Sequence, residues 1–357
     1  MLAGISLGLI DNCQVFGNLV STNKLAGLLI AWQDKSDISN CRSYGNITAT
    51  DAVGGIVGYN CRSNGADIGE ITNCSNYATI IATGLSLETN ETGVGGIVGL
   101  TGSATTISGC NNYGSISTDC DINSGIGGIV GNLYPTVVIN CNNYGAVSGV
   151  VAVGGIVGYG RQNGSIENCE NKGVITGSYH VGGISGENRS NITNSKNHAL
   201  VTVSDAGAGY WIGGIAGMSG AAASITSCEN NGTIIGIGSS FGGVGGIIGG
   251  LYGKLSNCIN NGNIYGELNL GGIVGYVQAN TGEIKDSRNN GDVHTSLTSG
   301  TVNLGCIAGN NLGIITGNEN YGKYVLPAEN ECVKYDFIVG YDTVGETGVY
   351  NNINYVS

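Results

Sequence analysis

The sequence predicts an all-β fold: a parallel β-helix (β-solenoid) of about eleven coils with three short strands in each. Three observations predict it. One Gly-rich block recurs along almost the whole chain. The apolar residues are largely β-branched and alternate with small or polar ones, which is the period of a strand. The 357 residues include 66 Gly, and Gly costs about 1 kcal/mol in a helix interior, so helical repeats are excluded.

The first element of the repeat is the block Gly-Gly-Ile-Val-Gly or a close variant of it. We expect this block to form the first strand of each coil, with Gly at points where backbones approach closely across a thin core. The block begins at Gly54, Gly95, Gly127, Gly154, Gly182, Gly213, Gly245 and Gly271, with weaker copies at Ala3, Ala26 and Gly305.

The second element reads aliphatic, any, Asn, Cys, any, Asn, any, Gly, and we expect it to carry the second strand. In stacked coils its Cys and Ile would point inward, and its second Asn would hydrogen-bond along the stack. The Cys column holds Cys13, Cys41, Cys74, Cys110, Cys141, Cys169, Cys228 and Cys258, with Ser195, Ser287 and Asn318 in other copies. The Asn column holds Asn76, Asn112, Asn143, Asn171, Asn230, Asn260 and Asn289.

The third strand should follow the Asn-x-Gly bend, as in residues 173–175. Gly and Asn supply left-handed backbone positions for such bends. The connection to the next block varies in length, which places the variable residues in loops. Parallel stacking would set neighbouring strands about 4.8 Å apart, and the crossover rule favours right-handed winding.

Two segments are predicted: residues 1–322 form the solenoid, and residues 323–357 form a C-terminal cap or the start of a following domain. The pattern breaks after Gly322, and the tail contains Pro327. A cap is expected because an open solenoid end exposes strand edges. The N-terminus has neither a cap nor the basic residues of a signal peptide. We therefore expect the chain to be a fragment of a longer protein, with a cytoplasmic protein as the alternative.

Together, the two repeated elements resemble the GLUG-motif repeat of bacterial surface proteins, over residues 1 to about 322. The resemblance implies an extracellular or cell-surface protein, often adhesin-like, whose repeats form stalks beside flanking domains. A host glycan or an extracellular protein would be its ligand. Some relatives carry an IgA-cleaving zinc peptidase domain. This chain lacks that domain, because none of its three histidines begins an HExxH motif.

Composition excludes several partners. With 13 basic and 25 acidic residues the formal net charge is −12. No basic cluster suits nucleic acid or an anionic membrane, and no apolar run approaches the roughly 20 residues of a membrane span. We therefore expect a non-catalytic structural or adhesive module.

The alternative is a polysaccharide-acting β-helix enzyme, a lyase or a hydrolase. Such an enzyme needs coupled charges on one outer face. Glu167, Glu170 and Glu187 share a region with Arg161, but no pattern couples them, and solvated surface charge is the simpler interpretation. No catalytic residue and no cofactor site is assigned.

Twelve Cys would suggest disulfides in a secreted protein. However, neighbouring strands lie about 4.8 Å apart, beyond the mean Cβ separation of about 3.8 Å in a disulfide. We therefore expect free, buried thiols. Zinc is not expected, since no CxxC occurs. Cys61, Cys120, Cys306 and Cys332 lie off the column, and a bridge between Cys61 and Cys120 stays open.

The residue before the repeat Gly is aromatic in the early copies. Stacked rings there would stabilise the sheet. Alternatively, a stripe made of Tyr44, Tyr77, Tyr113 and Tyr144 would bind sugar rings or a partner protein. The full column reads Phe16, Tyr44, Tyr77, Tyr113, Tyr144, Lys172, His198, Asn231, Asn261, Asn290 and Tyr321.

Overall fold

The computed structural model describes residues 1–22, 25–61, 69–83, 92–118, 125–204, 211–237, 242–297, 302–327, 333–336, 338–342 and 348–355. These residues form strands and turns, with no helix among them. The strands stack in parallel as a β-solenoid of about ten turns, which confirms the predicted fold class. Handedness stays a prediction. The chain divides into two compact units, Met1–Ile175 with Ile184–Gly186 (unit 1) and Thr176–Gly183 with Glu187–Ser357 (unit 2).

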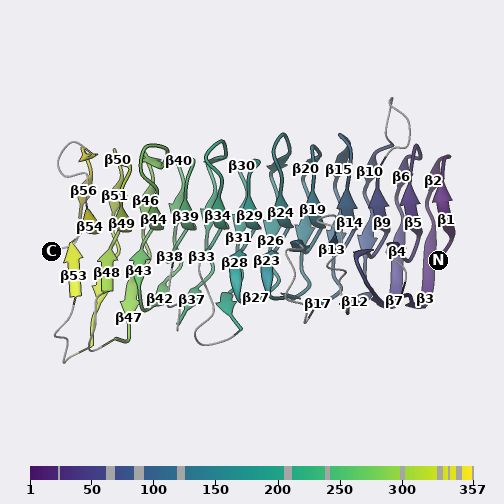
Figure 1. Cartoon of the computed structure of the whole chain (residues 1–357), viewed down its shortest axis with the longest axis horizontal. Coiled ribbons are helices and arrows are strands. Elements are labelled where there is room, and N and C mark those ends of the chain that lie inside the picture. The colour runs from purple at the N-terminus through teal and green to yellow at the C-terminus, as the bar shows by residue number, and fades with distance from the viewer. Residues whose placement is uncertain are drawn as a thin grey trace. The chain divides into compact units, whose positions relative to one another are not determined.

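In unit 1 the strands of successive coils lie side by side in four parallel sheets, A to D (Figure 1). Sheet A contains β1 (Ala3–Ser6), β5 (Ile30–Gln33), β9 (Val57–Asn60), β14 (Val98–Thr101), β19 (Val130–Leu133) and β24 (Val157–Gly160). Sheet B contains β2 (Ile10–Asp11), β6 (Ile38–Ser39), β10 (Ile71–Thr72), β15 (Thr106–Ser108), β20 (Val137–Ile139) and β25 (Ser165–Glu167). Sheet C contains β3 (Gln14–Val20), β7 (Arg42–Ala49), β11 (Ser75–Asn76), β12 (Thr79–Ala82), β16 (Asn111–Asn112), β17 (Ile116–Thr118), β21 (Asn142–Asn143), β22 (Val147–Ser148) and β26 (Glu170–Asn171). Sheet D contains β4 (Leu25–Gly27), β8 (Ala52–Gly54), β13 (Gly93–Gly95), β18 (Gly125–Gly127) and β23 (Val151–Gly154).

Unit 2 repeats the same four-sheet arrangement. Its sheet A contains β34 (Ala216–Ser219), β39 (Ile248–Leu251), β44 (Val274–Val277), β49 (Ala308–Asn311) and β54 (Val339–Asp342). Its sheet B contains β30 (Asn191–Thr193), β35 (Ser224–Thr226), β40 (Lys254–Ser256), β45 (Glu283–Lys285), β50 (Ile314–Thr316) and β55 (Val349–Tyr350). Its sheet C contains β31 (Lys196–Asn197), β32 (Val201–Val203), β36 (Glu229–Asn230), β37 (Ile234–Gly236), β41 (Ile259–Asn260), β42 (Ile264–Gly266), β46 (Arg288–Asn289), β47 (Val293–Thr295), β51 (Glu319–Asn320), β52 (Tyr324–Val325) and β56 (Ile353–Asn354). Its sheet D contains β28 (Tyr179–Gly182), β33 (Trp211–Gly213), β38 (Gly243–Gly245), β43 (Asn269–Gly271), β48 (Val302–Gly305) and β53 (Val333–Asp336). Two further strands, β27 (Ile175–Gly177) and β29 (Ser185–Asn188), are divided between the units.

The prediction of three strands per coil was wrong, because the Gly-Gly-Ile-Val-Gly block is a corner and not a strand. β13 ends at Gly95 and β14 begins at Val98, so the block turns the chain from sheet D into sheet A. A Cβ on Gly95 would overlap the carbonyl oxygen of Val98 across this turn. A Cβ on Gly99 would overlap the backbone of Val53 in sheet D. Sheets A and D therefore pack against each other through glycine backbone, without a side-chain layer between them.

The second corner, between sheets B and C, depends on the residue before the Cys. Asn73 and Asn140 there have φ of 53° and 56°, in the left-handed region that Asn tolerates best after Gly. We had predicted this conformation for the Asn-x-Gly bend instead. At that bend Gly114 is required because a Cβ would overlap the carbonyl oxygen of Ala78 in the preceding coil.

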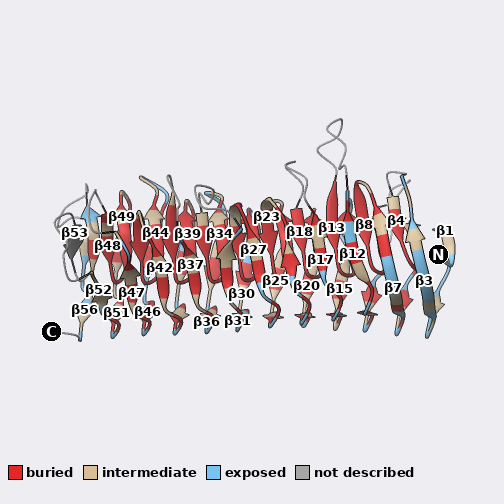
Figure 2. Ribbon diagram, turned by 90° about the horizontal axis from the view of Figure 1, so that it is seen from below, coloured by how far each residue is buried: buried red, intermediate tan, exposed pale blue. Residues whose placement is uncertain are grey.

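Figure 2 shows that buried residues recur in the successive strands. The buried apolar residues are mainly aliphatic and Cys, and they form the core inside each coil. Within unit 1, Ile71 pairs in register with Ile38 and Ile107, and all three are fully buried. Like residues thus cover one another from coil to coil, as the repeat predicts. The column cysteines are buried free thiols, apart from Cys13, which is partly exposed. That confirms the prediction for the column.

Cys61 is partly exposed and Cys306 is buried, and both carry reduced thiols. Cys120 and Cys332 lie outside the described residues, and so does the bridge that we considered between Cys61 and Cys120.

The C-terminal segment adds strands to all four sheets of unit 2. β53 pairs with β48, β54 with β49, β55 with β50 and β56 with β51, each in parallel. The solenoid geometry therefore extends past Gly322. The boundary at that residue and the capping role of residues 323–357 stay predictions.

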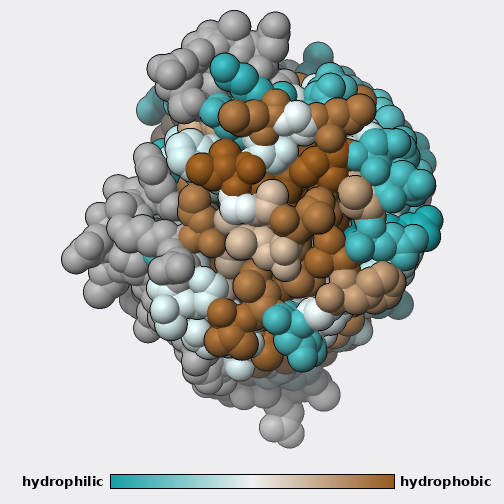
Figure 3. Space-filling model, turned by 90° about the vertical axis from the view of Figure 1, so that its right-hand side faces the viewer, coloured by the Kyte–Doolittle hydropathy of each residue, from teal (hydrophilic) through white to brown (hydrophobic). Residues whose placement is uncertain are grey.

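The first coil presents an apolar face. Figure 3 shows this end of the molecule, where hydrophobic residues gather at the centre. Leu2, Ile5, Leu7, Leu9 and Val20 are all exposed there. The position of Leu2 is fully buried in the next coils, as Leu29 and Ile56, because those coils are covered on both sides. Ile5 and Val20 pair with Trp32 and Thr48, which are only partly buried.

Candidate functional site

Five aromatic rings form a continuous stack on the outside of sheet C in unit 1, here called the aromatic ladder: Phe16, Tyr44, Tyr77, Tyr113 and Tyr144. Successive ring centroids are 4.7, 4.9, 4.7 and 4.8 Å apart, and the ring planes differ by only 5–7°. The parallel register of β3 and β7 sets Phe16 directly opposite Tyr44. The structure therefore brings all four tyrosines of the predicted stripe together.

The faces of these rings are covered, because each tyrosine stacks between two neighbours. At the far end the ammonium of Lys172 lies 5.2 Å from the centre of the Tyr144 ring. The ammonium donates to the Glu170 carboxylate in a 2.7 Å ion pair, and this hydrogen bond is the largest cause of the raised pKa of Lys172. The cation–π contact thus closes the stack. The ladder offers ring edges to solvent and not ring faces, apart from the outer face of Phe16.

The tyrosines of the ladder are partly exposed, and their hydroxyl groups have no hydrogen-bond partner among the described residues. Tyr77, Tyr113 and Tyr144 are 41%, 43% and 40% exposed. Within the described residues, no protein group hydrogen-bonds to these three phenols or to that of Tyr44. Burial against the neighbouring rings raises the pKa of Tyr113, so this phenol stays protonated and can donate at neutral pH.

The columns on the two sides of the ladder are polar and contain amides at some positions: they hold Gln14, Arg42, Ser75, Asn111 and Asn142 on one side and Asn18, Asn46 and Thr79 on the other. On one side Asn142 donates to Asn111 Oδ1 at 3.1 Å, and on the other Asn46 donates to Asn18 Oδ1 at 2.9 Å. Each pair leaves further amide donors or acceptors directed at solvent. The ladder is thus a strip of phenol hydroxyls flanked by hydroxyl and amide side chains, and by Arg42 beside Tyr44.

The same column is mostly polar in unit 2. Asn261 donates to Asn231 at 2.8 Å, and Asn290 donates to Asn261 at 2.7 Å. Aromatic stacking returns at the end, where the rings of Tyr321 and Tyr355 lie 4.4 Å apart. The Tyr321 hydroxyl already donates to Glu319 at 3.4 Å. One column therefore carries two surface chemistries, as its sequence predicts.

Other aromatic groups were not predicted, because they come from different columns of the repeat. In unit 2, Trp211 of β33 lies 5.4 Å from Tyr276 and 6.3 Å from Tyr252, with tilted or edge-on rings. The Trp211 ring lies over Gly250, where a Cβ would be 2.6 Å from Cε3. In unit 1, the Arg161 guanidinium lies 3.8 Å from the centre of the Tyr159 ring. One sheet A position is aromatic in some coils, as at Tyr159 and Tyr276, and Gly in another, as at Gly250, and this alternation was the sequence pattern that could have revealed these groups.

The carboxylates noted in the sequence are each paired separately. Glu187 is buried and binds both His180 (3.1 Å) and Arg189 (2.9 Å). Glu167 accepts a hydrogen bond from Ser165, and Glu170 binds Lys172 as described above. The contact between Glu187 and His180 was missed because the two residues belong to different strands, β29 and β28. No group of three metal-ligating side chains occurs in the described part of the chain.

The inward Cys column shows why Cys, Ser and Asn replace one another. Cys and Ser side chains of this column can both accept the backbone N–H of the column residue in the preceding coil: Cys141 Sγ accepts from Cys110 (3.4 Å), and Ser287 Oγ accepts from Cys258 (3.1 Å). Each also donates to the carbonyl two residues before it, as Cys141 does to Ile139 at 3.3 Å. The column therefore selects short side chains that both donate and accept.

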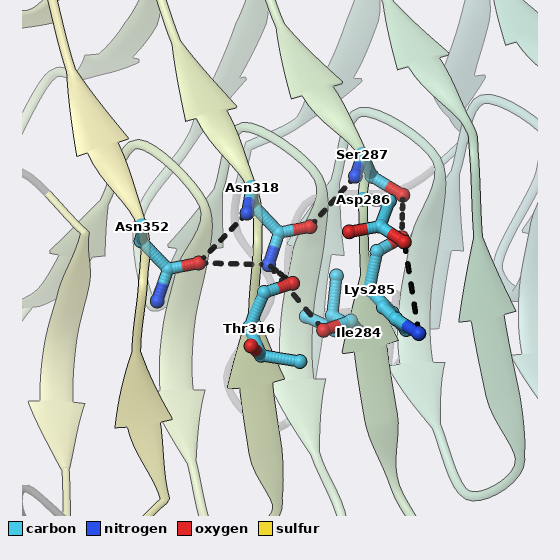
Figure 4. A network of polar contacts seen from close by, with 7 residues as sticks. All are labelled: Ile284, Lys285, Asp286, Ser287, Thr316, Asn318 and Asn352. Atoms are coloured by element: carbon cyan, nitrogen blue, oxygen red, sulfur yellow. Dashed lines mark hydrogen bonds and ion pairs between the residues drawn. The ribbon is translucent and has the colours of Figure 1, made fainter.

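The last coils of this column are polar, as Figure 4 shows for unit 2. Asn318 accepts from the N–H of Ser287 at 2.9 Å, and Asn352 accepts from the N–H of Asn318 at 2.9 Å. A hollow of about 340 Å³ lies outside this corner. Its charges are internally paired: Arg288 binds Glu319 at 3.0 Å, and Lys285 lies 3.8 Å from Asp286.

Comparison with protein families gives one match, to the GLUG motif, at residues 149–176. The chain is a GLUG-motif repeat protein. The matched copy contains the corner block that begins at Gly154, the buried Cys169 and the buried Asn171. The same features recur in the other GLUG coils. Comparison with curated proteins found no match, and comparison with solved structures found none.

The Asn of each GLUG coil forms a second internal ladder. Asn76 donates to Asn112, Asn112 to Asn143 and Asn143 to Asn171, each at 2.8 Å. The amide also donates to the carbonyl two residues on, as from Asn112 to Gly114 at 2.9 Å. These contacts confirm the predicted Asn stack.

A search of the described residues for a helix that could span a membrane found none.

Proposed function

We propose that this GLUG solenoid is a non-catalytic structural and adhesive module of a secreted or cell-surface bacterial protein, with flanking domains beyond the chain. Within each unit the solenoid supplies a stiff support, because neighbouring coils are joined by four sheets and two internal ladders. The ligand of the module is a host glycan or an extracellular protein.

One observation carries the adhesive part of the proposal. The aromatic ladder places four tyrosines on one outer face with hydroxyl groups that no described protein group binds. A purely internal role would not require the phenol oxygens, since phenylalanine stacks equally well. Exposed aromatic side chains with one polar end are typical of binding surfaces.

The experiment is a binding screen of the whole chain against a glycan array and a panel of host-matrix proteins, beside a polysaccharide depolymerase assay. We expect at least one ligand and no depolymerase activity. Binding should weaken in the double variant Tyr77→Ala with Tyr113→Ala. The matched control is Asn231→Ala with Asn261→Ala, which changes the polar part of the same column.

Two outcomes would contradict the proposal. If no ligand is found, or if ligands bind the Tyr77/Tyr113 variant as tightly as the unchanged chain, the adhesive part fails and a spacer remains. If the chain shortens a polysaccharide, the non-catalytic part fails.

A further inference from the structure

We infer that the aromatic ladder binds an extended, neutral polysaccharide that lies along the ladder and is held by the phenol hydroxyls of Tyr44, Tyr77, Tyr113 and Tyr144. This inference rests on the proposed adhesive function and names its ligand class and mode of recognition.

The covered ring faces determine the mode of recognition. Sugars that stack on proteins lie against an open aromatic face, and in the ladder those faces are 4.7–4.9 Å from the next ring. No sugar ring fits into such a gap. The parts that a ligand reaches are ring edges and hydroxyl groups, and a phenol both donates and accepts. Recognition therefore goes through hydrogen bonds to hydroxyl groups of the ligand.

The spacing of the ladder determines the shape of the ligand. The rings are nearly parallel, so the hydroxyls repeat along the solenoid at the ring separation of 4.7–4.9 Å. An extended polypeptide advances about 3.3 Å per residue and would fall out of step with these hydroxyls. A chain of β-linked sugars carries hydroxyl groups at every ring and advances by about one rung of the ladder per sugar. The spacing favours a polysaccharide over a protein strand.

Charge determines the class of polysaccharide. The chain has a formal net charge of −12, which repels polyanionic glycans. Arg42, an exposed cation two residues before Tyr44, lies in the column of Ser75, Asn111 and Asn142. The positions two residues before and after Tyr77, Tyr113 and Tyr144 are uncharged. At the end of the stack Lys172 is neutralised by Glu170 at 2.7 Å. A neutral polysaccharide therefore fits the strip best.

The test removes only hydroxyl groups. The triple variant Tyr77→Phe, Tyr113→Phe and Tyr144→Phe keeps the ring stack, so it should fold and melt like the unchanged chain. Binding is measured by affinity electrophoresis in gels that contain a neutral β-glucan, hydroxyethyl cellulose, with carboxymethyl cellulose as the anionic counterpart. Tyr321→Phe is the matched control, because its hydroxyl already donates to Glu319 and lies in unit 2.

We expect the neutral glucan to retard the chain, the triple Phe variant to bind at least tenfold more weakly, and the Tyr321 control to be unchanged. The inference is overturned if the triple Phe variant is retarded like the unchanged chain, or if only the anionic polymer causes retardation. It is also overturned if the binding screen finds a protein ligand and no neutral glycan.

These failures differ from failure of the adhesive proposal. If the Tyr77/Tyr113 Ala variant loses its ligand while the triple Phe variant keeps it, adhesion through the ladder stands and recognition by hydroxyls fails. If neither variant affects binding, both fail.

Discussion

The side chain of Asn112 lies in the space that a side chain on Gly96 would fill, although the two residues belong to different parts of the repeat. A Cβ on Gly96 would overlap Cγ of Asn112, and it would also overlap the carbonyl oxygen of Gly128 in the next coil. Gly246 has the same relationship with Asn260 in unit 2. The second Gly of the GLUG block is thus required by the Asn ladder.

Gly96→Ala should therefore lower the free energy of unfolding by about 3 kcal/mol. The added methyl group displaces the Asn112 amide, which breaks its 2.8 Å bond to Asn143 and leaves buried polar groups without partners. The urea midpoint of unfolding measures the effect. Gly8→Ala is the control, since no atom lies within 4 Å of the added Cβ. Equal midpoints for the two variants would contradict the overlap.

Asn143→Ala should cost about 2–4 kcal/mol, because it leaves the amide of Asn112, Oδ1 of Asn171 and the carbonyl of Gly145 without their buried partner. The neighbouring Asn142→Ala changes a partly exposed amide and should stay within about 0.5 kcal/mol. Chemical denaturation of both variants tests the difference. A loss for Asn142→Ala as large as for Asn143→Ala would argue against an internal ladder.

Cys141→Ser should be tolerated within about 1 kcal/mol, whereas Cys141→Ala should cost about 1–3 kcal/mol. Serine keeps the acceptor for the Cys110 N–H and the donor to Ile139, as Ser287 does in its own coil. Alanine leaves the Cys110 N–H unsatisfied. Melting temperatures of the two variants decide between hydrogen bonding and mere volume. If the Cys141→Ala and Cys141→Ser variants melt at the same temperature, the hydrogen bonds contribute little to stability.

The buried thiols of Cys141 and Cys258 should be unreactive, and they should make the free energy of unfolding fall at alkaline pH. Burial raises the pKa of Cys141 and Cys258 above the ordinary value of 9.0. The folded chain then keeps protons that the unfolded chain loses, so stability is complete below about pH 9 and falls as pH rises further.

Urea midpoints at pH 7 and pH 10 measure this loss, and Cys141→Ser should reduce it. Alkylation of the native chain followed by peptide mass spectrometry should modify Cys13 and Cys61 before the buried column. Equal labelling of Cys13 and Cys141 would show that the column opens readily.

The stacked columns could be predicted because repetition alone sets them. Any parallel stack places Cys74 over Cys41, and Asn112 over Asn76, whatever the outline of the coil. The outline itself could not be predicted. Whether Gly95–Gly99 continues a strand or turns a corner depends on the backbone of Val53 in another coil, which the local sequence does not reveal.

The candidate site was predicted in part. The aromatic column was visible, but the covered ring faces and the closing contact of Lys172 depend on ring orientation. The contacts of Glu187 with His180 and of Trp211 with Gly250 join positions that do not share a column. Pairs of that kind leave no periodic signal in the sequence.

The Asn ladder has a direction. Within each unit the amides donate toward the C-terminal neighbour, as from Asn76 to Asn112 in unit 1 and from Asn230 to Asn260 in unit 2. A coil can therefore be inserted or lost only as a whole repeat in the same orientation, because each new neighbour must supply an acceptor where the old one did. Gene duplication of single repeats meets this condition automatically, so proteins of this kind can change length over evolution without redesigning their interior.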